Sequence, residues 1–250
     1  MSAPLSEAAR RNGARRPKPV ADGVWIIESE PIKVGGGMPL PIRMSVIRMT
    51  SGDLLLHSPV QYSDDLKSAI EALGPIRHLI APSIGHWMFL RDWQRACPAA
   101  KTWGVAGLKD RSQVRKAGIR IDAELGDHAP EPWTSEIDQV LVRAPVFKEV
   151  DFFHRASRTL LLTDLVLNVE PQQFSPLWRV MASALGILAP NGKAPAYVRA
   201  LLKLNRAETA RAAARLVAFD SERVIFAHGT WFERGGAARL RRSLSWLLKT

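Results

Sequence analysis

The feature that most constrains this chain is an alternation of short apolar runs with amphipathic segments, which recurs through both halves of its 250 residues. Short apolar runs bounded by Gly, Pro and Asp are typical of buried strands, whereas apolar residues at helical spacing indicate helices that pack on a sheet. Two of the runs, residues 149–154 and 159–163, are close enough to form a hairpin. We therefore expect mixed sheets with helices outside them, in an α+β or α/β fold.

Individual elements follow from the same patterns. Ser63 can cap a helix over residues 64–73, because Asp64 and Asp65 suit its first turn and Gly74 ends it. Further helices are predicted at residues 88–97, 108–116 and 240–248, and in a segment at 176–219 that Pro and Gly interrupt. Strands are predicted at residues 24–27, 44–49, 54–57, 76–80, 102–105, 137–142, 149–154, 159–163 and 224–227, the first three as a β-meander.

The chain is predicted to contain one domain and a tail. Residues 1–20 lack apolar periodicity and carry excess positive charge, so we expect a basic, disordered tail. Residues 21–250 can form one domain with a buried core, in which residues 175–219 are a helical insert. The tail contains an acidic residue, Glu7, and the basic residues Arg10, Arg11, Arg15, Arg16 and Lys18.

Charge and cysteine content restrict the partners and the compartment. The net charge of +11 would favour binding to nucleic acid. No recognition motif or aromatic platform accompanies the charge, however, which argues against nucleic acid as a partner. Weak peripheral membrane contact stays an alternative, because basic residues accompany the apolar ones of the insert.

Cys97 is the only cysteine, so disulfides are excluded and a reducing, cytoplasmic location is expected. The most apolar window, residues 181–190, is too short to span a membrane, so we expect a soluble protein. The oligomeric state is left open.

Three polar residues come directly after apolar strands and are candidates for chemistry. His86 follows the run at 76–80, Asp164 follows 160–162, and His228 follows 224–227. Sites in layered α/β proteins gather where strand ends meet, and imidazole with carboxylate suits zinc, iron or manganese. Taken alone, a histidine or aspartate at such a position more often has a structural role, as a loop histidine or a capping aspartate, than a role in chemistry. His78 and His128 are expected at the surface.

The order of these segments resembles the second half of a metallo-β-lactamase-fold protein, and more closely a bacterial family, the DUF4336 proteins. The resemblance covers residues 20–250 and implies a four-layer αββα sandwich in which an aspartate and a late histidine ligate metal. The stretches that carry it are Met38-Pro39-Leu40-Pro41-Ile42-Arg43-Met44, Leu56-His57-Ser58-Pro59, Ile76-Arg77-His78-Leu79-Ile80-Ala81-Pro82, residues 89–93, Glu136-Ile137-Asp138-Gln139, Phe152-Phe153-His154-Arg155, Ser157-Arg158-Thr159-Leu160, Thr163-Asp164-Leu165 and Ala227-His228-Gly229.

The chain departs from the metal motif of that fold. The signature His-x-His-x-Asp-His is replaced by Ser83-Ile84-Gly85-His86-Trp87-Met88, and the mid-sequence histidine is absent from residues 143–146. The resemblance therefore leaves His86, Asp164 and His228 as metal ligands. His57 and His154 are spare ligands, or groups that orient a ligand. One zinc, iron or manganese ion is the most that such a set implies, and no metal at all is the alternative.

Two functions are compatible with these residues. The first is a single-metal hydrolase, acting on an ester, thioester or phosphoester of small-molecule size, in which the metal lowers the pKa of a water molecule to about 7. Asp92, several residues beyond His86, does not replace the missing aspartate of the motif. The second is a non-catalytic binding or scaffold protein that keeps the fold without metal. The retained Asp164 and His228 favour the first, and the missing histidines favour the second.

Overall fold

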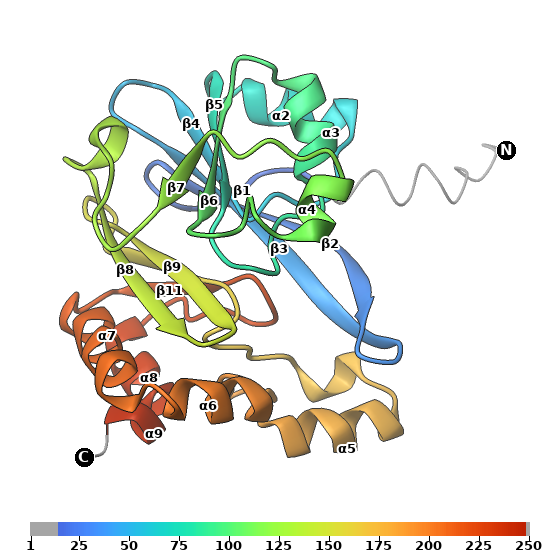
Figure 1. The fold of residues 1–250 in the computed structure, drawn as a ribbon, viewed down its shortest axis with the longest axis vertical. Coiled ribbons are helices and arrows are strands. Elements are labelled where there is room, and N and C mark those ends of the chain that lie inside the picture. Colours follow the sequence, from blue (N-terminus) through green and yellow to red (C-terminus); the bar gives the residue numbers. More distant parts are fainter. Residues whose placement is uncertain (1–14, 249–250) are drawn as a thin grey trace, which may run out of the picture.

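The computed structural model describes residues 15–248, and its strands form two sheets (Figure 1). The first sheet has the order β1-β2-β3-β4-β5-β6-β7, and the second has the order β11-β10-β9-β8. The first contains β1 (Lys18–Ala21), β2 (Val24–Val34), β3 (Met38–Arg48), β4 (Leu54–His57), β5 (Ile76–Ala81), β6 (Lys101–Val105) and β7 (Ala123–Leu125). The second contains β8 (Ile137–Ala144), β9 (Phe147–His154), β10 (Thr159–Leu162) and β11 (Arg223–Phe226).

Helices cover the outer face of each sheet. In Figure 1, α2, α3 and α4 lie beside the first sheet, while α6, α7, α8 and α9 lie against the second. The result is the predicted four-layer αββα sandwich. The helices are α2 (Asp64–Glu71), α3 (Leu90–Ala96), α4 (Ser112–Lys116), α5 (Pro176–Leu185), α6 (Ala196–Lys203), α7 (Arg206–Ala218), α8 (Gly236–Ser243) and α9 (Ser245–Leu248), with 3₁₀ turns η1 (Glu131–Trp133) and η2 (Pro171–Gln173).

The core has a layer on each side of the second sheet, because successive residues of a strand face opposite ways. Val150 and Phe152 of β9 pack with the core of the first sheet, whereas Phe147 and Phe153 pack with residues of α6 and α7. A strand buried on both faces is apolar almost throughout. A charged residue inside such a strand, as Glu149 is, therefore needs a specific partner.

Strands β2 and β3 continue well beyond the predicted limits of 24–27 and 44–49. Both pass through prolines, which lack the N–H group that a strand ladder uses. The register shifts between Ser29 and Ile32, so Pro31 falls in an irregular part of the ladder. The long hairpin carries Pro41 toward the second sheet, where its carbonyl oxygen meets His228.

Two predicted helices differ from the structure. Only residues 112–116 of the segment 108–116 are helical, because Leu108 and Arg111 make tight turn hydrogen bonds to the carbonyls three residues before them. The closing segment 240–248 is divided between α8 and α9. Leu244, which lies between them, has φ −96° and ψ 4°, outside the helical range.

The predicted tail, residues 1–20, falls mostly outside the described residues, but its last part does not. Lys18 to Val20 belong to β1, which pairs antiparallel with β2, so ordered structure begins before residue 21. The segment predicted as a helical insert contains α5, α6 and α7. None of the helices in the described part of the chain is long and apolar enough to cross a membrane.

Candidate metal centre

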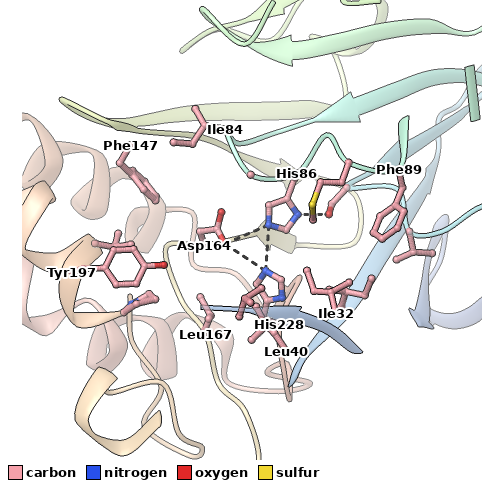
Figure 2. A pocket seen from close by; sticks show the side chains of 18 of the residues that line it. Ile32, Leu40, Ile84, His86, Phe89, Phe147, Asp164, Leu167, Tyr197 and His228 are labelled. Atoms are coloured by element: carbon pink, nitrogen blue, oxygen red, sulfur yellow. Dashed lines mark hydrogen bonds and ion pairs between the residues drawn. The ribbon is translucent and has the colours of Figure 1, made fainter. Parts of the chain in front are cut away.

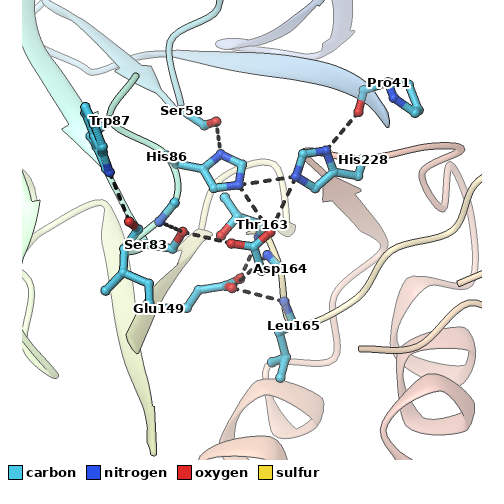
Figure 3. A network of polar contacts seen from close by, with 12 residues as sticks. Pro41, Ser58, Ser83, His86, Trp87, Glu149, Thr163, Asp164, Leu165 and His228 are labelled. Atoms are coloured by element: carbon cyan, nitrogen blue, oxygen red, sulfur yellow. Dashed lines mark hydrogen bonds and ion pairs between the residues drawn. The ribbon is translucent and has the colours of Figure 1, made fainter. Parts of the chain in front are cut away.

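The ends of three strands bring His86, Asp164 and His228 together, and we call these residues the triad (Figure 3). β10 and β11 are parallel neighbours, so the residues that follow them, Asp164 and His228, emerge at the same edge of the second sheet. His86 lies in a turn after β5 and reaches this edge from the first sheet. The clustering expected from the strand ends is what the structure contains.

The three ligand atoms of the triad form a nearly equilateral triangle. His86 Nε2 lies 3.3 Å from His228 Nε2, and Asp164 Oδ1 lies 3.4 Å from each of these nitrogens. A tetrahedral zinc site with bonds of about 2.0–2.1 Å separates its ligand atoms by about 3.3–3.4 Å. The triangle therefore matches one face of such a site and leaves the fourth vertex open.

Each histidine is oriented through the ring nitrogen that faces away from the triangle. His228 Nδ1 lies 2.8 Å from the Pro41 carbonyl oxygen, and because a carbonyl only accepts, Nδ1 carries the proton. His86 Nδ1 contacts the Ser58 hydroxyl at 2.5 Å. These contacts direct both Nε2 atoms toward Asp164, as metal-binding imidazoles require.

Asp164 is an ionised carboxylate held by its surroundings. Burial acts to raise its pKa, but the charges and hydrogen bonds of His86 and His228 hold the pKa of Asp164 well below its usual range. The same charge of Asp164 outweighs burial at His86 and raises the pKa of that imidazole. The Ser83 hydroxyl donates to Asp164 Oδ2 at 3.0 Å. A carboxylate of this kind is a good ligand for a divalent cation.

Glu149 fixes the turn that carries Asp164. Its side chain is fully buried and accepts the backbone N–H groups of Thr163, Asp164 and Leu165 at 2.6, 2.7 and 3.0 Å. Burial raises the pKa of Glu149, and hydrogen bonds from Asp151, Thr163 and Asp164 offset only part of this effect. The sequence analysis missed this residue. A glutamate inside a predicted strand was the signal that could have revealed it.

Arg43 and Gly229 shape the turn after β11. The buried guanidinium of Arg43 donates to the carbonyls of Phe226 and Gly229, both at 2.7 Å, and pairs with Glu28 at 3.0 Å. Gly229 has φ +87°, and a Cβ atom there would lie 2.3 Å from the Asn168 carbonyl oxygen. Only glycine fits this position beside His228.

The spare histidines are not in the group of ligand atoms that forms the triad. His57 is buried, its ring lies against Phe152, and burial, with a smaller effect of the charge of His86, lowers its pKa to about 3. Its neighbour Ser58, which the sequence analysis missed, faces His86 instead. His154 pairs with Thr159 at the start of β10, the end opposite Asp164, and contacts Ser157. His154 is therefore out of reach of the triad.

Two further expectations concern single residues. His78 was expected at the surface and is buried, where its Nδ1 accepts from Trp103 Nε1 at 3.1 Å. The sequence alone did not show that Trp103 would enclose it. His128 is exposed, as predicted. Trp87 donates to the Ile84 carbonyl, and Asp92 is an exposed residue of α3. Neither joins the triad.

A cavity of about 420 Å³ opens beside the triad (Figure 2). One wall comes from β2 and β3, with Ile32, Leu40 and Ile42, and the opposite wall comes from β9 and α6. Figure 2 shows His86, Asp164 and His228 at one side of the cavity and the ring of Tyr197 directed toward Asp164. The triad therefore faces a space that a small molecule can enter.

Comparisons with known proteins agree with this architecture. Residues 21–191 match the family described as a domain of unknown function, DUF4336. No curated protein sequence matches the chain. A metallo-beta-lactamase from Pontibacter korlensis is 13% identical with a TM-score of 0.62, and the alignment covers 94% of this chain and all of that one.

Two larger proteins contain the same fold. The rubredoxin oxygen:oxidoreductase of Desulfovibrio gigas is 12% identical with a TM-score of 0.64, over 93% of this chain and 61% of that one. The metal-soaked Flv1 flavodiiron core from Synechocystis is 14% identical with a TM-score of 0.63, over 94% and 61%. At these identities the likeness concerns the fold alone, and it confirms the predicted metallo-β-lactamase fold.

Proposed function

The chain belongs to the DUF4336 family and has the metallo-β-lactamase fold, and on this premise we propose that it is a hydrolase that uses one metal ion. The proposed ligands are His86 Nε2, Asp164 Oδ1 and His228 Nε2. The observation that carries the proposal is the triangle of 3.3 and 3.4 Å formed by these atoms. Imidazole and carboxylate ligands suit zinc, and they also suit iron and manganese.

The residues around the triad support one metal ion and not two. Among the described residues, the triad is the one group of three His, Cys, Asp or Glu side chains close enough to share an ion. His57 and His154, the spares considered from the sequence, face elsewhere. A site of three protein ligands with an open position is typical of catalytic zinc.

A metal ion bound there would lower the pKa of a water molecule to about 7 and polarise a carbonyl or phosphoryl oxygen. The chain's own residues set the geometry: Ser58 and the Pro41 carbonyl orient the two imidazoles, and Ser83 orients the carboxylate. In hydrolysis the oxygen of water bonds to the acyl carbon or to phosphorus, the bond to the leaving oxygen or sulfur breaks, and the water proton ends on the leaving atom. Esters, thioesters and phosphoesters fit this scheme.

Metal analysis of the purified chain tests the proposal. We expect about one equivalent of metal in protein purified without chelator, and a tetrahedral spectrum after loading with cobalt. His86→Ala should lose the metal, whereas the matched control His128→Ala, at an exposed histidine outside the triad, should retain it. Two equivalents, or equal retention by both variants, would contradict the single-metal site.

A metal-free binding protein is the competing function. It is favoured by one observation: among the described residues that line the cavity, Asp164 is the sole carboxylate, so no second one stands ready as a general base. Protein that takes up no zinc, iron or manganese at micromolar concentration, and yet binds ligands in the cavity, would establish this function in place of hydrolysis.

A further inference from the structure

We propose that the site acts on an uncharged compound with an apolar acyl chain, which lies in the cavity with its carbonyl group facing the triad and Tyr197. This inference rests on the proposed function and narrows it from three bond classes to carboxylic esters and thioesters. It is carried by the chemistry of the cavity wall, by the hydrogen bonds that turn Arg199 of α6 to other partners, and by the orientation of a single phenol.

The wall of the cavity is apolar except beside the triad. Ile32, Leu40 and Ile42 line it from the first sheet, and Phe147, Val198 and Leu201 line it from the other side. Among the described lining residues, the side chains with polar atoms are the triad, Ser58 and Tyr197. An acyl chain buried there is stabilised by each methylene group that leaves water. A strongly polar substrate would lose its hydration without new partners.

Lysine and arginine are absent from the described residues of the cavity wall, although the chain carries a net charge of +11. Arg199 lies on α6 between lining residues, but its guanidinium donates to the carbonyls of Leu185 and Ala194, at 3.2 and 2.9 Å. Sites for phosphate or carboxylate groups use such cations. The phosphoester alternative is therefore disfavoured, as is an acyl chain that carries its own anionic group.

Tyr197 supplies a donor at the polar end of the cavity. Its ring projects from the first turn of α6, and Figure 2 shows its hydroxyl oxygen pointing toward Asp164. Tyr197 is 63% exposed, and an ordinary phenol keeps its proton at neutral pH. A neutral O–H group placed there can donate to the carbonyl oxygen of a bound ester as negative charge develops on it.

The reaction is balanced by water alone. The oxygen of water bonds to the acyl carbon, the bond from that carbon to the leaving oxygen or sulfur breaks, and the leaving atom takes the proton. The products are a carboxylic acid and an alcohol or thiol. The acid ionises at neutral pH, and no lysine or arginine occurs among the described residues of the cavity wall to pair with its carboxylate.

Binding to metal-free protein tests the cavity apart from catalysis. The probe is the methyl ester of a fluorescent polyene fatty acid, added after the metal has been removed with a chelator. Met88→Lys with Val146→Lys places cations at two lining residues that are 51% and 66% exposed, so folding should survive. We expect the Kd of the ester to rise at least about tenfold. The matched control pair, Val180→Lys with Leu204→Lys, alters equally exposed apolar residues outside the cavity and should leave the Kd unchanged.

Turnover by the metal-loaded protein tests the substrate class. We expect kcat/KM to rise at least about tenfold from p-nitrophenyl acetate to p-nitrophenyl octanoate, with no release from p-nitrophenyl phosphate. An octanoyl thioester of N-acetylcysteamine distinguishes thioesters from esters. Tyr197→Phe should lower kcat by about a hundredfold and leave KM and ester binding nearly unchanged, as loss of one donor to the transition state predicts.

The outcomes separate this inference from the proposed function. Ester binding in the cavity without turnover by the metal-loaded protein would support the apolar binding site but contradict the proposed hydrolase activity. Turnover without chain-length preference, or faster turnover of the phosphate, would support hydrolase activity but contradict the proposed acyl substrate. If the double variant in the cavity and the control double variant lost ester binding equally, the ester would bind on the outer surface. This result would also contradict the proposed site for the acyl chain.

Discussion

The two halves of the candidate metal centre are supported in different ways. Asp164 and His228, at the ends of adjacent parallel strands, depend on main-chain contacts: three N–H groups bound by Glu149, and the Pro41 carbonyl. His86 lies in a loop, and the side chain that orients its ring is a serine hydroxyl. The contrast indicates that the second half of the site is anchored to main-chain groups of the sheet, with Glu149 and Ser83 as side-chain partners, whereas the orientation of the His86 ring depends on one side-chain hydroxyl.

The largest effect is expected at Gly229, in the half built into the sheet. Gly229→Ala would place Cβ 2.3 Å from the Asn168 carbonyl oxygen at φ +87°, so we expect a loss of more than about 3 kcal/mol in unfolding free energy and loss of metal binding. Gly36→Ala is the matched control, since φ is +83° there and nothing lies within 4 Å of the new Cβ. Its backbone strain alone should cost about 1 kcal/mol. Urea titration measures both, and equal losses would contradict the close approach.

A smaller loss is expected at Glu149. Glu149→Gln replaces one carboxylate oxygen with an NH₂ group, which cannot accept from the N–H groups around Asp164, so we expect a loss of about 2 kcal/mol and weaker metal binding. Glu30→Gln, an exposed position on β2, is the control and should change neither quantity. A Glu149→Gln protein of unchanged stability would show that the turn does not need the charge.

The half that depends on side chains is tested at Ser58. Ser58→Ala removes the hydroxyl from His86 Nδ1, so we expect metal affinity to fall about tenfold and stability by about 1 kcal/mol. Ser157→Ala removes the same kind of hydroxyl–imidazole contact from His154, 2.7 Å in length, and should leave metal affinity unchanged. Competition with a chromophoric chelator measures both affinities. If Ser157→Ala weakened binding as much as Ser58→Ala, the placement of His154 away from the metal would be wrong.

The smallest effect is expected at Glu28, which pairs with Arg43 behind His228. Burial acts to raise the pKa of Glu28, but hydrogen bonds from Arg43 and Lys18 outweigh it and lower that pKa below 4.5. The ionised form is therefore favoured in the folded state, and its stabilisation is full above pH 4.5 and lost as pH falls through the folded-state pKa. Since Glu28 is half-exposed, Glu28→Gln should cost no more than about 1 kcal/mol at pH 7. Unfolding curves should show a larger difference between the two proteins at pH 7 than at pH 3.

The sequence predicted the part of the site that local patterns encode. Asp164 and His228 each follow an apolar run, and the rule that strand ends gather at one edge was sufficient to pair them. Glu149 and Ser58 could not be found in this way, because each meets its partner only through strand pairing between distant segments. His154 shows the same limit: a histidine at a strand end resembles a ligand until the register with β10 places it at the opposite edge.

The fold itself was predictable where periodicity was strong and less so where proline intervened. The hairpin of β9 and β10 and the helix capped by Ser63 occur at the expected places. The long hairpin of β2 and β3 was underestimated, since Pro39 and Pro41 argue against strand structure in any local reading. Pro41 is nevertheless the residue whose carbonyl orients His228. A residue outside the predicted strand limits is therefore in contact with the triad.

The hydrogen bonds of Arg43 have a consequence for how the two sheets separate when the protein unfolds locally. Its guanidinium belongs to the first sheet, but two of its hydrogen bonds end on carbonyls of the turn after β11 in the second. Separating the sheets would remove two of the acceptors of this buried cation and leave it with Glu28 alone, a cost of several kcal/mol that a partial opening could not recover. Amide hydrogens of β3 and β11 should therefore exchange with solvent together and at one rate, as a single cooperative unit. Replacing Arg43 with methionine should let the two strands exchange independently.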